Sequence, residues 1–461
     1  AKTLESRFAE RVKMEPELLG YHYEQAGLAG PAVDYWRLAA QRDAARSANA
    51  EALGHFNRAL QGLNGLPESS ERDQSELAIL IARGASLLLV KGYASDDIEH
   101  NFLRARSLSQ LSPDSEQYFL SMWGLWVFHL VRGPLEKARV LADDLLSWAT
   151  RRQDPDLLIR AHESVGSTYS FLGRFDEAKT HLLAAKALYD PDKHRSQVLP
   201  YTQDPGITAR IMLARTLWML GEVDHVETLL AEAMAMAREL EHPFTLAFAL
   251  ATVSWVYSTV RDADRTLSLT EEAIVLSTKY SFEVPLAWAT SLHGWAMTEK
   301  GKREGLGEIV KGLSAAQAAK ASLNNTYTLT LLAEVYLRQK RIDEGLRTLA
   351  DAQQLVHAQG EACWQAELLR LKGELLLERS EPSVSAAEQC CTEALRIAQG
   401  QHARMLELRA ATSLAKLLLK SNRSATAREL LNATLSRFGA QGANSSRSEA
   451  QIILEQLNVA P

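Results

Sequence analysis

Two groups of side chains in this 461-residue chain have the types and spacing to contact a partner. The first is a polar cluster in the proline-rich segment 189–206, comprising Asp190, His194, Arg195, Tyr201 and Asp204. Such groups can bind a charged partner, or they can cap tight turns of the backbone. Because Tyr-Asp-Pro and Asp-Pro-Gly are turn sequences in themselves, we favour the structural role. His194, Arg195, Tyr201 and Asp204 are the partner-binding candidates of this segment.

The second group consists of tryptophans, of which the chain has nine. They recur in the first helices of successive predicted hairpins, at Trp123, Trp126, Trp218, Trp255, Trp288, Trp295 and Trp364. Large apolar rings usually fill the layer between helices, so most of them should be core residues. A minority on the concave surface would anchor a peptide or a partner helix. We take Trp218, Trp255 and Trp295 as candidates, although the sequence does not separate groove from core.

Motifs typical of enzymes are not found. The sequence Lys300-Gly301-Lys302-Arg303 lacks the leading glycine and the following hydroxyl of a phosphate-binding loop. His162-Glu163 begins like a zinc-protease motif, but Gly166 occupies the place of the second histidine. A Gly-x-Ser-x-Gly nucleophile motif is also missing. We therefore predict a non-catalytic chain with no catalytic residues, no cofactor and no metal.

Composition excludes several other classes of protein. The net charge is −6, so no overall basic field attracts nucleic acid or an anionic membrane surface. No apolar run reaches the roughly 18 residues of a membrane span. The three cysteines, Cys363, Cys390 and Cys391, offer neither a disulfide framework nor a Cys-x-x-Cys pair, and they fit small buried positions. We expect a cytoplasmic protein that binds neither nucleic acid directly nor membrane.

The elements that must position these side chains are helices. Alanine and leucine dominate, while the chain has only 13 Pro and 25 Gly. Segment 160–189 shows the recurring unit best, with Gly166 in an apolar first helix and Gly173 at its end. Ala178 and Leu182 line the second helix. Small residues where the helices cross allow close approach, and glycine supplies the left-handed turn.

This unit repeats with a period of about 40 residues, longer than the roughly 34 of a standard tetratricopeptide unit. The expected turns are at Gly133, Gly173, Gly221, Arg261-Asp262, Lys300-Gly301, Lys340-Arg341, Ser380 and Asn422. The interval stretches to about 48 residues across the segment 189–206. The fold expected is an all-α, right-handed superhelical solenoid of about ten antiparallel helix hairpins.

Three regions follow from the regularity of the repeat. Residues 1–114 should form less regular hairpins, and residues 115–440 regular tetratricopeptide-like repeats with a long loop at 189–206. Residues 441–461 should form a linker and a C-terminal capping helix, expected at 447–457.

Several stretches resemble one known arrangement: 16–56, 189–206, 237–250, 364–377 and 394–417. They are similar to the C-terminal tetratricopeptide region of large bacterial signalling proteins. Those proteins carry a class III adenylate/guanylate cyclase domain, or a winged-helix DNA-binding domain, followed by an AAA (STAND-type) ATPase. Residues 424–461 match this pattern only loosely. The chain holds no cyclase or ATPase motif, and its start without Met suggests an excised fragment.

The resemblance implies a regulatory role. We expect a non-catalytic protein-interaction and sensor domain that regulates an attached ATPase and nucleotide cyclase. The alternative is the sensor or oligomerisation domain of a STAND-type ATPase transcriptional regulator. An enzyme with a cavity inside the superhelix is a third reading, disfavoured because no motif supports it. The expected partners are a protein or peptide in the concave groove, the intramolecular ATPase and cyclase domains, and a small-molecule inducer.

Overall fold

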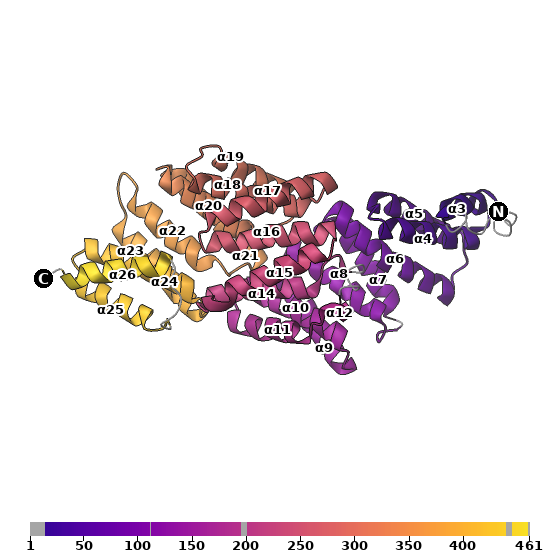
Figure 1. The fold of residues 1–461 in the computed structure, drawn as a ribbon, viewed down its shortest axis with the longest axis horizontal. Coiled ribbons are helices and arrows are strands. Elements are labelled where there is room, and N and C mark those ends of the chain that lie inside the picture. Colours follow the sequence, from indigo (N-terminus) through magenta and orange to yellow (C-terminus); the bar gives the residue numbers. More distant parts are fainter. Residues whose placement is uncertain (1–13, 111, 195–200, 439–444, 460–461) are drawn as a thin grey trace. The chain divides into compact units, whose positions relative to one another are not determined.

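The computed structural model describes residues 14–110, 112–194, 201–438 and 445–459. Within these ranges every regular element is a helix and no strand occurs (Figure 1). This confirms the all-α prediction. The chain forms two compact units, residues 1–129 with 193–204, and residues 130–192 with 205–461. The three regions defined by repeat regularity (1–114, 115–440 and 441–461) stay a prediction.

The first unit is built from helical hairpins with a continuous apolar core. Its helices are α3 (Pro16–Gln25), α4 (Ala29–Ala45), α5 (Asn49–Leu63), α6 (Ser70–Lys91), α7 (Asp96–Ser109) and α8 (Glu116–Arg132), the last as far as residue 129. The ring of Phe102 packs against Gly84 of α6 and Gly124 of α8, and a Cβ at either glycine would lie 2.4 Å from the ring. Glycine at these two positions therefore lets the helices close over a phenylalanine.

The second unit holds the regular repeats. It contains α9 (Leu135–Arg152), α10 (Pro155–Phe171), α11 (Phe175–Leu188), α14 (Pro205–Leu220), the short 3₁₀ helix η2 (Val223–His225), α15 (Val226–Glu239), α16 (Pro243–Thr259), α17 (Ala263–Tyr280), α18 (Glu283–Glu299), α19 (Gly305–Ala318), α20 (Asn325–Arg338), α21 (Ile342–Gln359), α22 (Gln365–Leu377), α23 (Val384–Gly400), α24 (Arg404–Lys420), α25 (Ser424–Leu435) and α26 (Ser445–Val459). The first helices of the hairpins also contact one another in chain order, from α10 through α14, α16, α18, α20 and α22 to α24. This is the arrangement of a helical-repeat solenoid.

Residues with a left-handed backbone conformation lie at the ends of many helices in the stack. Most predicted turns have one, at Gly133, Gly173, Gly221, Arg261, Gly301, Lys340 and Asn422. A second set, which the sequence did not reveal, ends the second helices of the hairpins, at Gln153, Glu241, Ser281, Lys320, Gly360 and His402. All but Gly360 in this set have side chains, so no glycine marks them in the sequence.

The helix crossing predicted around Gly166 is present. A Cβ at Gly166 of α10 would lie 2.5 Å from Cγ of Leu182 and 3.2 Å from the carbonyl oxygen of Ala178, both on α11. Leu182 and Ala178 are buried. A glycine on one helix thus allows the backbone of the other to come close, as its small size suggests.

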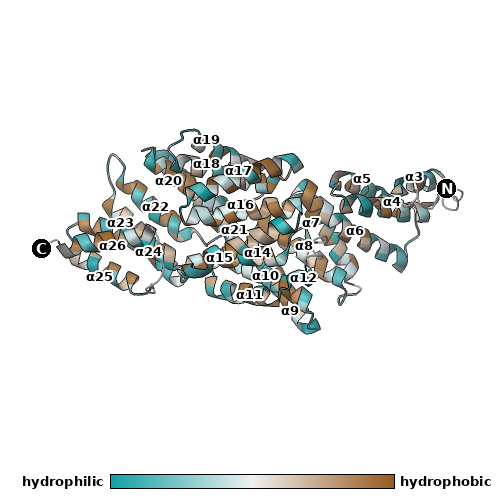
Figure 2. Cartoon of the chain, viewed as in Figure 1, coloured by the Kyte–Doolittle hydropathy of each residue, from teal (hydrophilic) through white to brown (hydrophobic). Residues whose placement is uncertain are grey.

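The first helices lie inside the second unit. In α14 and α16 nearly every side chain is buried, whereas α17 and α21 bury one face only. Figure 2 shows the hydrophobic and hydrophilic residues that alternate along the helices. A helix that is apolar on all sides needs neighbours on all sides. For α14 and α16 the second helices of the hairpins cover only part of that surface.

Chain that lies much further along the sequence covers more of that surface, since Arg215 of α14 contacts Cys363 and Thr259 of α16 contacts Arg409. Similar contacts occur at the ends of α8 and α10. The carbonyl oxygen of Val131 accepts hydrogen bonds from the backbone N–H groups of Ser322 (2.9 Å) and Leu323 (3.0 Å). The carbonyl oxygen of Phe171 accepts one from the N–H of Cys363 at 3.2 Å. We call these the inter-turn contacts, because they join one superhelical turn of the second unit to the next. The inside of the solenoid is therefore closed at these places.

Helices occupy parts of the segment 189–206, which we predicted to be a long loop. It contains a short helix, α12 (Pro191–His194), and α14 already begins at Pro205. Proline suits the first turn of a helix because the N–H it lacks has no partner there. A C-terminal helix, α26, spans Ser445–Val459, and its role as a cap stays a prediction. Residues 195–200, and most of the predicted linker before α26, lie outside the described residues.

Candidate functional site

Three of the candidate polar residues of the segment 189–206 lie in the core of the first unit, whereas Asp190 is half-buried and belongs to the second unit. His194, Tyr201 and Asp204 are buried there. The Tyr201 ring meets the ring of Trp123 edge to face, with centroids 5.0 Å apart. Arg195 lies outside the described residues. The structural role that we favoured for these side chains fits their burial, and partner binding by them stays a prediction.

A hydrogen-bonded anchor holds the end of this segment in the first unit. The hydroxyl groups of Tyr93 and Thr202 are 2.7 Å apart, and the amide of Gln203 donates to the Tyr93 hydroxyl at 2.9 Å. Thr202 has a φ of 61°, the left-handed region that a β-branched residue rarely adopts. The surrounding contacts thus fix a backbone conformation that threonine alone would avoid.

The three candidate tryptophans are also buried. The exposed fractions of Trp218, Trp255 and Trp295 are 2%, 4% and 0%. A guanidinium group lies over each ring, from Arg409 at 5.2 Å, Arg215 at 4.6 Å and Arg261 at 5.8 Å, respectively. Rings in such positions gain cation–π attraction, which is stronger away from water. A role for these rings in binding a partner stays a prediction, and a peptide would have to displace the chain's own side chains to reach them.

Arg215 has several partners in this interior. It donates to the hydroxyl of Ser170 at 2.6 Å and to Sγ of Cys363 at 2.9 Å. Its guanidinium also lies 4.6 Å from the Phe171 ring. Burial raises the pKa of the Cys363 thiol to about 12, although Arg215 opposes this. The Cys363 side chain is therefore a neutral packing group and a poor nucleophile.

Four charged residues and one serine from α22 and α24 form a largely buried cluster, which we call the inner charge network: Glu367, Arg370, Glu374, Arg409 and Ser413. Arg370 donates two hydrogen bonds to Glu367, at 2.9 and 2.8 Å, and one to Glu374 at 2.5 Å. Arg409 lies 3.5 Å from Glu367. Burial alone would raise the pKa of the Glu367 carboxyl, but Arg370 and Arg409 outweigh it and hold the pKa at about 2.

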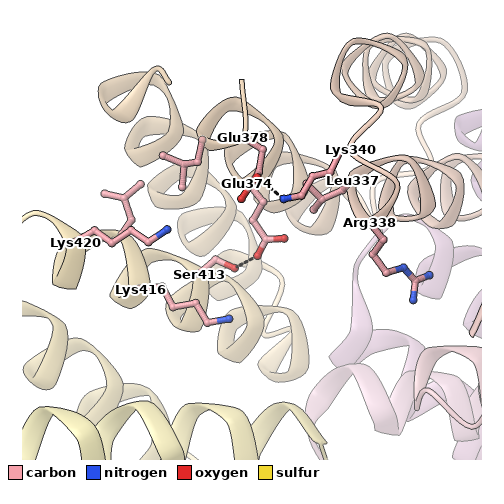
Figure 3. Close-up of a pocket in the computed structure, with 10 residues that line it drawn as sticks. Leu337, Arg338, Lys340, Glu374, Glu378, Ser413, Lys416 and Lys420 are labelled. Carbon is pink, nitrogen blue, oxygen red and sulfur yellow. Dashed lines mark hydrogen bonds and ion pairs between the residues drawn. The ribbon is translucent and has the colours of Figure 1, made fainter. Parts of the chain in front are cut away.

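One edge of the inner charge network reaches a pocket of about 430 Å³. The pocket lies among the C-terminal ends of α20, α22 and α24 (Figure 3). It is lined by Leu337, Arg338, Lys340, Glu374, Leu377, Glu378, Ser413, Lys416, Leu417 and Lys420. Its volume is within the range of ligand-binding pockets. We call it the basic pocket, because its lining has four cationic and two anionic side chains.

The cations stand on two sides of the basic pocket. Figure 3 shows Lys416 and Lys420 on one side of Glu374, with Arg338 and Lys340 on the other. Lys340 pairs with Glu378 at 2.5 Å. Glu374 accepts a hydrogen bond from Ser413 at 2.8 Å as well as the one from Arg370. Both carboxylates of the lining are therefore already neutralised.

The remaining cations are held only loosely. Arg338 pairs with Glu299 and Lys416 pairs with Glu449 of α26, each at 2.5 Å and each with partly exposed side chains. Exposed pairs of this kind contribute about 0–1 kcal/mol. Lys420 makes no ion pair within 4 Å among the described residues, and its charge acts on the Glu378 carboxylate at longer range. These three cations can therefore turn to an external anion at low cost in free energy.

The cations at the ends of these helices also have a purely structural explanation. Lysine and arginine in the last turn of a helix stabilise its negative end by about 0.3–1 kcal/mol. Arg338 and Lys420 are the last residues of α20 and α24. No sequence pattern marks the basic pocket, because its residues look like ordinary surface charges and come from three hairpins. The helix ends that bring them together are spaced by the repeat period, which was the only available signal.

A second cavity shows how full the interior is elsewhere. It lies beside Trp255, Trp288 and Tyr327 and measures about 10 Å³, the room of one water molecule. The described residues also contain no group of three or more His, Cys, Asp or Glu side chains arranged to hold a metal ion. None of the helices described has the length and apolar character needed to cross a membrane.

Comparison with known proteins identifies the fold, but it does not identify the function. No protein-family model matches the sequence, and no curated protein does. Among solved structures, the Cut9–Hcn1 hetero-tetramer of the APC/C matches with 12% identity and a TM-score of 0.50, over 93% of this chain and 76% of that one. A likeness at such identity shows the fold alone, and it agrees with an all-α helical-repeat solenoid.

Two further matches have lower TM-scores. The Rap protein complexed with competence and sporulation factor has 13% identity and a TM-score of 0.48, with 75% of this chain and 99% of that one covered. A STAND protein with a tetratricopeptide repeat sensor from Pyrococcus horikoshii has 13% identity and a TM-score of 0.39, with 87% and 66% covered. Neither score is high enough to carry an argument about function.

Proposed function

We propose that this chain is a non-catalytic protein-interaction domain. The observation that supports it best is the basic pocket. This pocket is open to solvent, and it forms only where three successive hairpins stack. The interior around Trp218 and Trp255 is closed by the chain's own side chains. A partner would therefore bind where helix ends meet at the surface, rather than along the inside of the solenoid.

The finer proposal is regulatory. The resemblance of segments such as 189–206 and 364–377 to the repeat regions of bacterial cyclase–ATPase proteins supports a sensor domain. In that role the chain would bind a partner segment or an inducer and so control an ATPase and a nucleotide cyclase. The alternative is the sensor or oligomerisation domain of a STAND-type ATPase transcriptional regulator. The coding sequence around this chain distinguishes the two, because only the first requires a cyclase domain.

The experiment is site-specific photo-crosslinking in the source cells. A photoreactive amino acid is placed at Glu378, beside the basic pocket, and for comparison at Arg303, in the turn between α18 and α19. We expect one protein, or one segment of the parent protein, to be joined at Glu378 and not at Arg303. The same products at both positions, or none at either, would contradict the interaction domain proposed.

If a parent protein with ATPase and cyclase domains is confirmed, its activities provide a second test. ATP hydrolysis and cyclic nucleotide formation would be measured in the full-length protein with and without this region. The regulatory proposal expects both rates to change on removal of the repeats. Unchanged rates, with both domains shown to be folded, would leave the interaction domain in place and reject the regulatory role.

A further inference from the structure

We propose that the basic pocket binds an acidic peptide segment, with carboxylate side chains paired to Arg338, Lys416 and Lys420. This inference rests on the proposed interaction function and names the class of its partner. The three cations come from α20 and α24, on opposite sides of the pocket. A ligand that satisfies both sides must therefore present negative charge at more than one point.

The charges of the lining favour an anion. Arg370 of the inner charge network neutralises Glu374, and Lys340 neutralises Glu378. The lining has four cations and two carboxylates, and two of the cations, Arg338 and Lys416, also pair with Glu299 and Glu449 outside the lining. Because Glu299 and Glu449 are partly exposed, they can return to water when a ligand carboxylate takes their place. The exchange replaces weak internal pairs with pairs across an interface.

The helix ends favour a peptide over a compact phosphate. α20, α22 and α24 all contribute their C-terminal ends to the basic pocket. Such ends carry partial negative charge and present carbonyl oxygens. Those of Leu337 and Leu417 accept the N–H groups of Lys340 and Ser421 in the following turns, and each keeps a second lone pair for a ligand N–H. Phosphate sites instead use helix N-termini, whose N–H groups donate to the anion. An acidic peptide offers carboxylates to the cations and backbone N–H groups to carbonyl oxygens, so it matches both features.

The floor of the pocket adds a polar contact. The hydroxyl of Ser413 lies between Glu374, at 2.8 Å, and Arg370, at 3.1 Å. Leu337, Leu377 and Leu417 supply the apolar part of the wall. A pocket of about 430 Å³ with this mixture has room for more than one side chain. The occupant expected is a short stretch with carboxylates separated by small or apolar residues.

The test uses a fluorescein-labelled peptide of alternating Glu and Ala, with a Gln-Ala peptide as its uncharged match. Binding to the whole chain is followed by fluorescence anisotropy. We expect the Glu peptide to bind and the Gln peptide not to bind. Affinity for the Glu peptide should also fall on going from about 50 mM to about 300 mM salt, because exposed charges are screened over a shorter distance.

Charge reversal locates the site. The double variant Lys416→Glu/Lys420→Glu should bind the Glu peptide at least about tenfold more weakly, since two attractive contacts become repulsive. Lys302→Glu/Arg303→Glu is the matched control, with the same change in net charge on an exposed turn of the same unit. It should bind within about twofold of the wild type. If the first variant fails to fold, judged by its melting temperature, Lys416→Gln/Lys420→Gln replaces it, with weaker binding again expected.

Three outcomes would overturn the inference. One is equal weakening by both double variants, which would indicate general charge attraction. Another is equal binding of the Gln and Glu peptides. The third is binding of inorganic phosphate that depends on Lys420 when the Glu peptide does not bind. If photo-crosslinking finds a partner whose binding ignores Lys416 and Lys420, the interaction domain stands and only the acidic-segment inference fails.

Discussion

A guanidinium N–H of Arg409 donates a hydrogen bond of 3.0 Å to the backbone carbonyl oxygen of Thr259, 150 residues earlier in the chain. Thr259 is the last residue of α16, and Arg409 lies on α24. The same guanidinium lies over the ring of Trp218 and beside the carboxylate of Glu367. One side chain of the α24 hairpin thus contacts three other hairpins, those of α14, α16 and α22.

Replacing Arg409 by alanine should therefore be costly. Glu367 would lose one of its two cations, and the Thr259 carbonyl would lose a donor, in a site with little water. We expect the free energy of unfolding to fall by about 3 kcal/mol, measured by urea denaturation. Arg396→Ala, which removes an exposed pair with Glu393, is the control and should cost less than about 1 kcal/mol. Equal costs for the two would show that the Arg409 contacts contribute nothing beyond a surface charge.

Two buried carboxyls should contribute a loss of stability as the pH rises from acid to neutral, because they hold protons in the folded state. His162, whose pKa burial lowers to about 4, contributes in the opposite direction between about pH 4 and 6.5. Burial raises the pKa of Glu361 to about 7 and that of Glu163 to about 7, from the ordinary value of 4.5 for a glutamate. Between pH 4.5 and 7 these two carboxyls therefore bind more protons in the folded state than in the unfolded state, and the stability that they contribute is lost through this window. Each group can contribute up to about 3 kcal/mol.

Glu361→Gln mimics the protonated carboxyl and should reduce this pH dependence. The Gln side chain keeps an oxygen for the N–H of Asn324, which now donates to Glu361 at 3.2 Å. We expect the variant to be more stable than the wild type at pH 8, and nearly equal to it near pH 4.5, in thermal unfolding over a pH series. The exposed Glu283→Gln is the comparison. A parallel curve for Glu361→Gln and wild type would contradict a raised pKa at this residue.

The crossing of α10 and α11 predicts an unusual effect of alanine. In an exposed helix position, Gly→Ala gains up to about 1 kcal/mol. At Gly166 the new Cβ would meet Leu182 and the backbone of α11, so Gly166→Ala should instead lower stability by about 1–3 kcal/mol. Gly307, on α19 of the same unit, has nothing within 4 Å of its would-be Cβ. Gly307→Ala should be neutral or stabilising, and a loss of the same size at both glycines would argue against the crossing.

A substitution at Tyr93 measures how much the hydrogen-bonded anchor of the segment 189–206 stabilises the first unit. Tyr93→Phe keeps the ring and removes the hydroxyl that meets Thr202 and Gln203. We expect a loss of about 1–2 kcal/mol, because the buried Thr202 hydroxyl loses a partner. Tyr118→Phe, elsewhere in the first unit, should change stability by less than about 0.5 kcal/mol. Denaturation of both variants with the same protocol decides whether the anchor contributes as the contacts indicate.

Local features of the sequence were enough to predict the helices and most of the turns between them. Glycines such as Gly173 and Gly221 mark the end of a first helix, and small residues such as Gly166 mark a crossing. Turns such as those at Gln153 and His402 gave no such signal, because polar residues with a Cβ take up the left-handed conformation there. Local chemistry does not separate these residues from their helical neighbours.

The positions of the candidate residues depended on contacts that no local pattern encodes. Trp218 is buried under Arg409, and Trp255 under Arg215, so residues from other hairpins determine which rings are covered. The basic pocket has the same origin, since Arg338 and Lys420 approach each other only after the helices have stacked. A repeat period predicts that hairpins stack, but it does not give the pitch of the stack, which decides what meets across it.

The inter-turn contacts have a consequence for how the second unit folds. In an open stack each hairpin touches only its neighbours, so folding can start anywhere and the ends can fray one at a time. Here Val131 pairs with a residue 191 positions later, which raises the contact order and adds loop-closure entropy to the barrier. The early hairpins of this unit should then gain full protection from hydrogen exchange only when α20–α24 are in place. The unit would gain and lose structure as one cooperative body, a property more typical of a globular domain than of a chain of repeats.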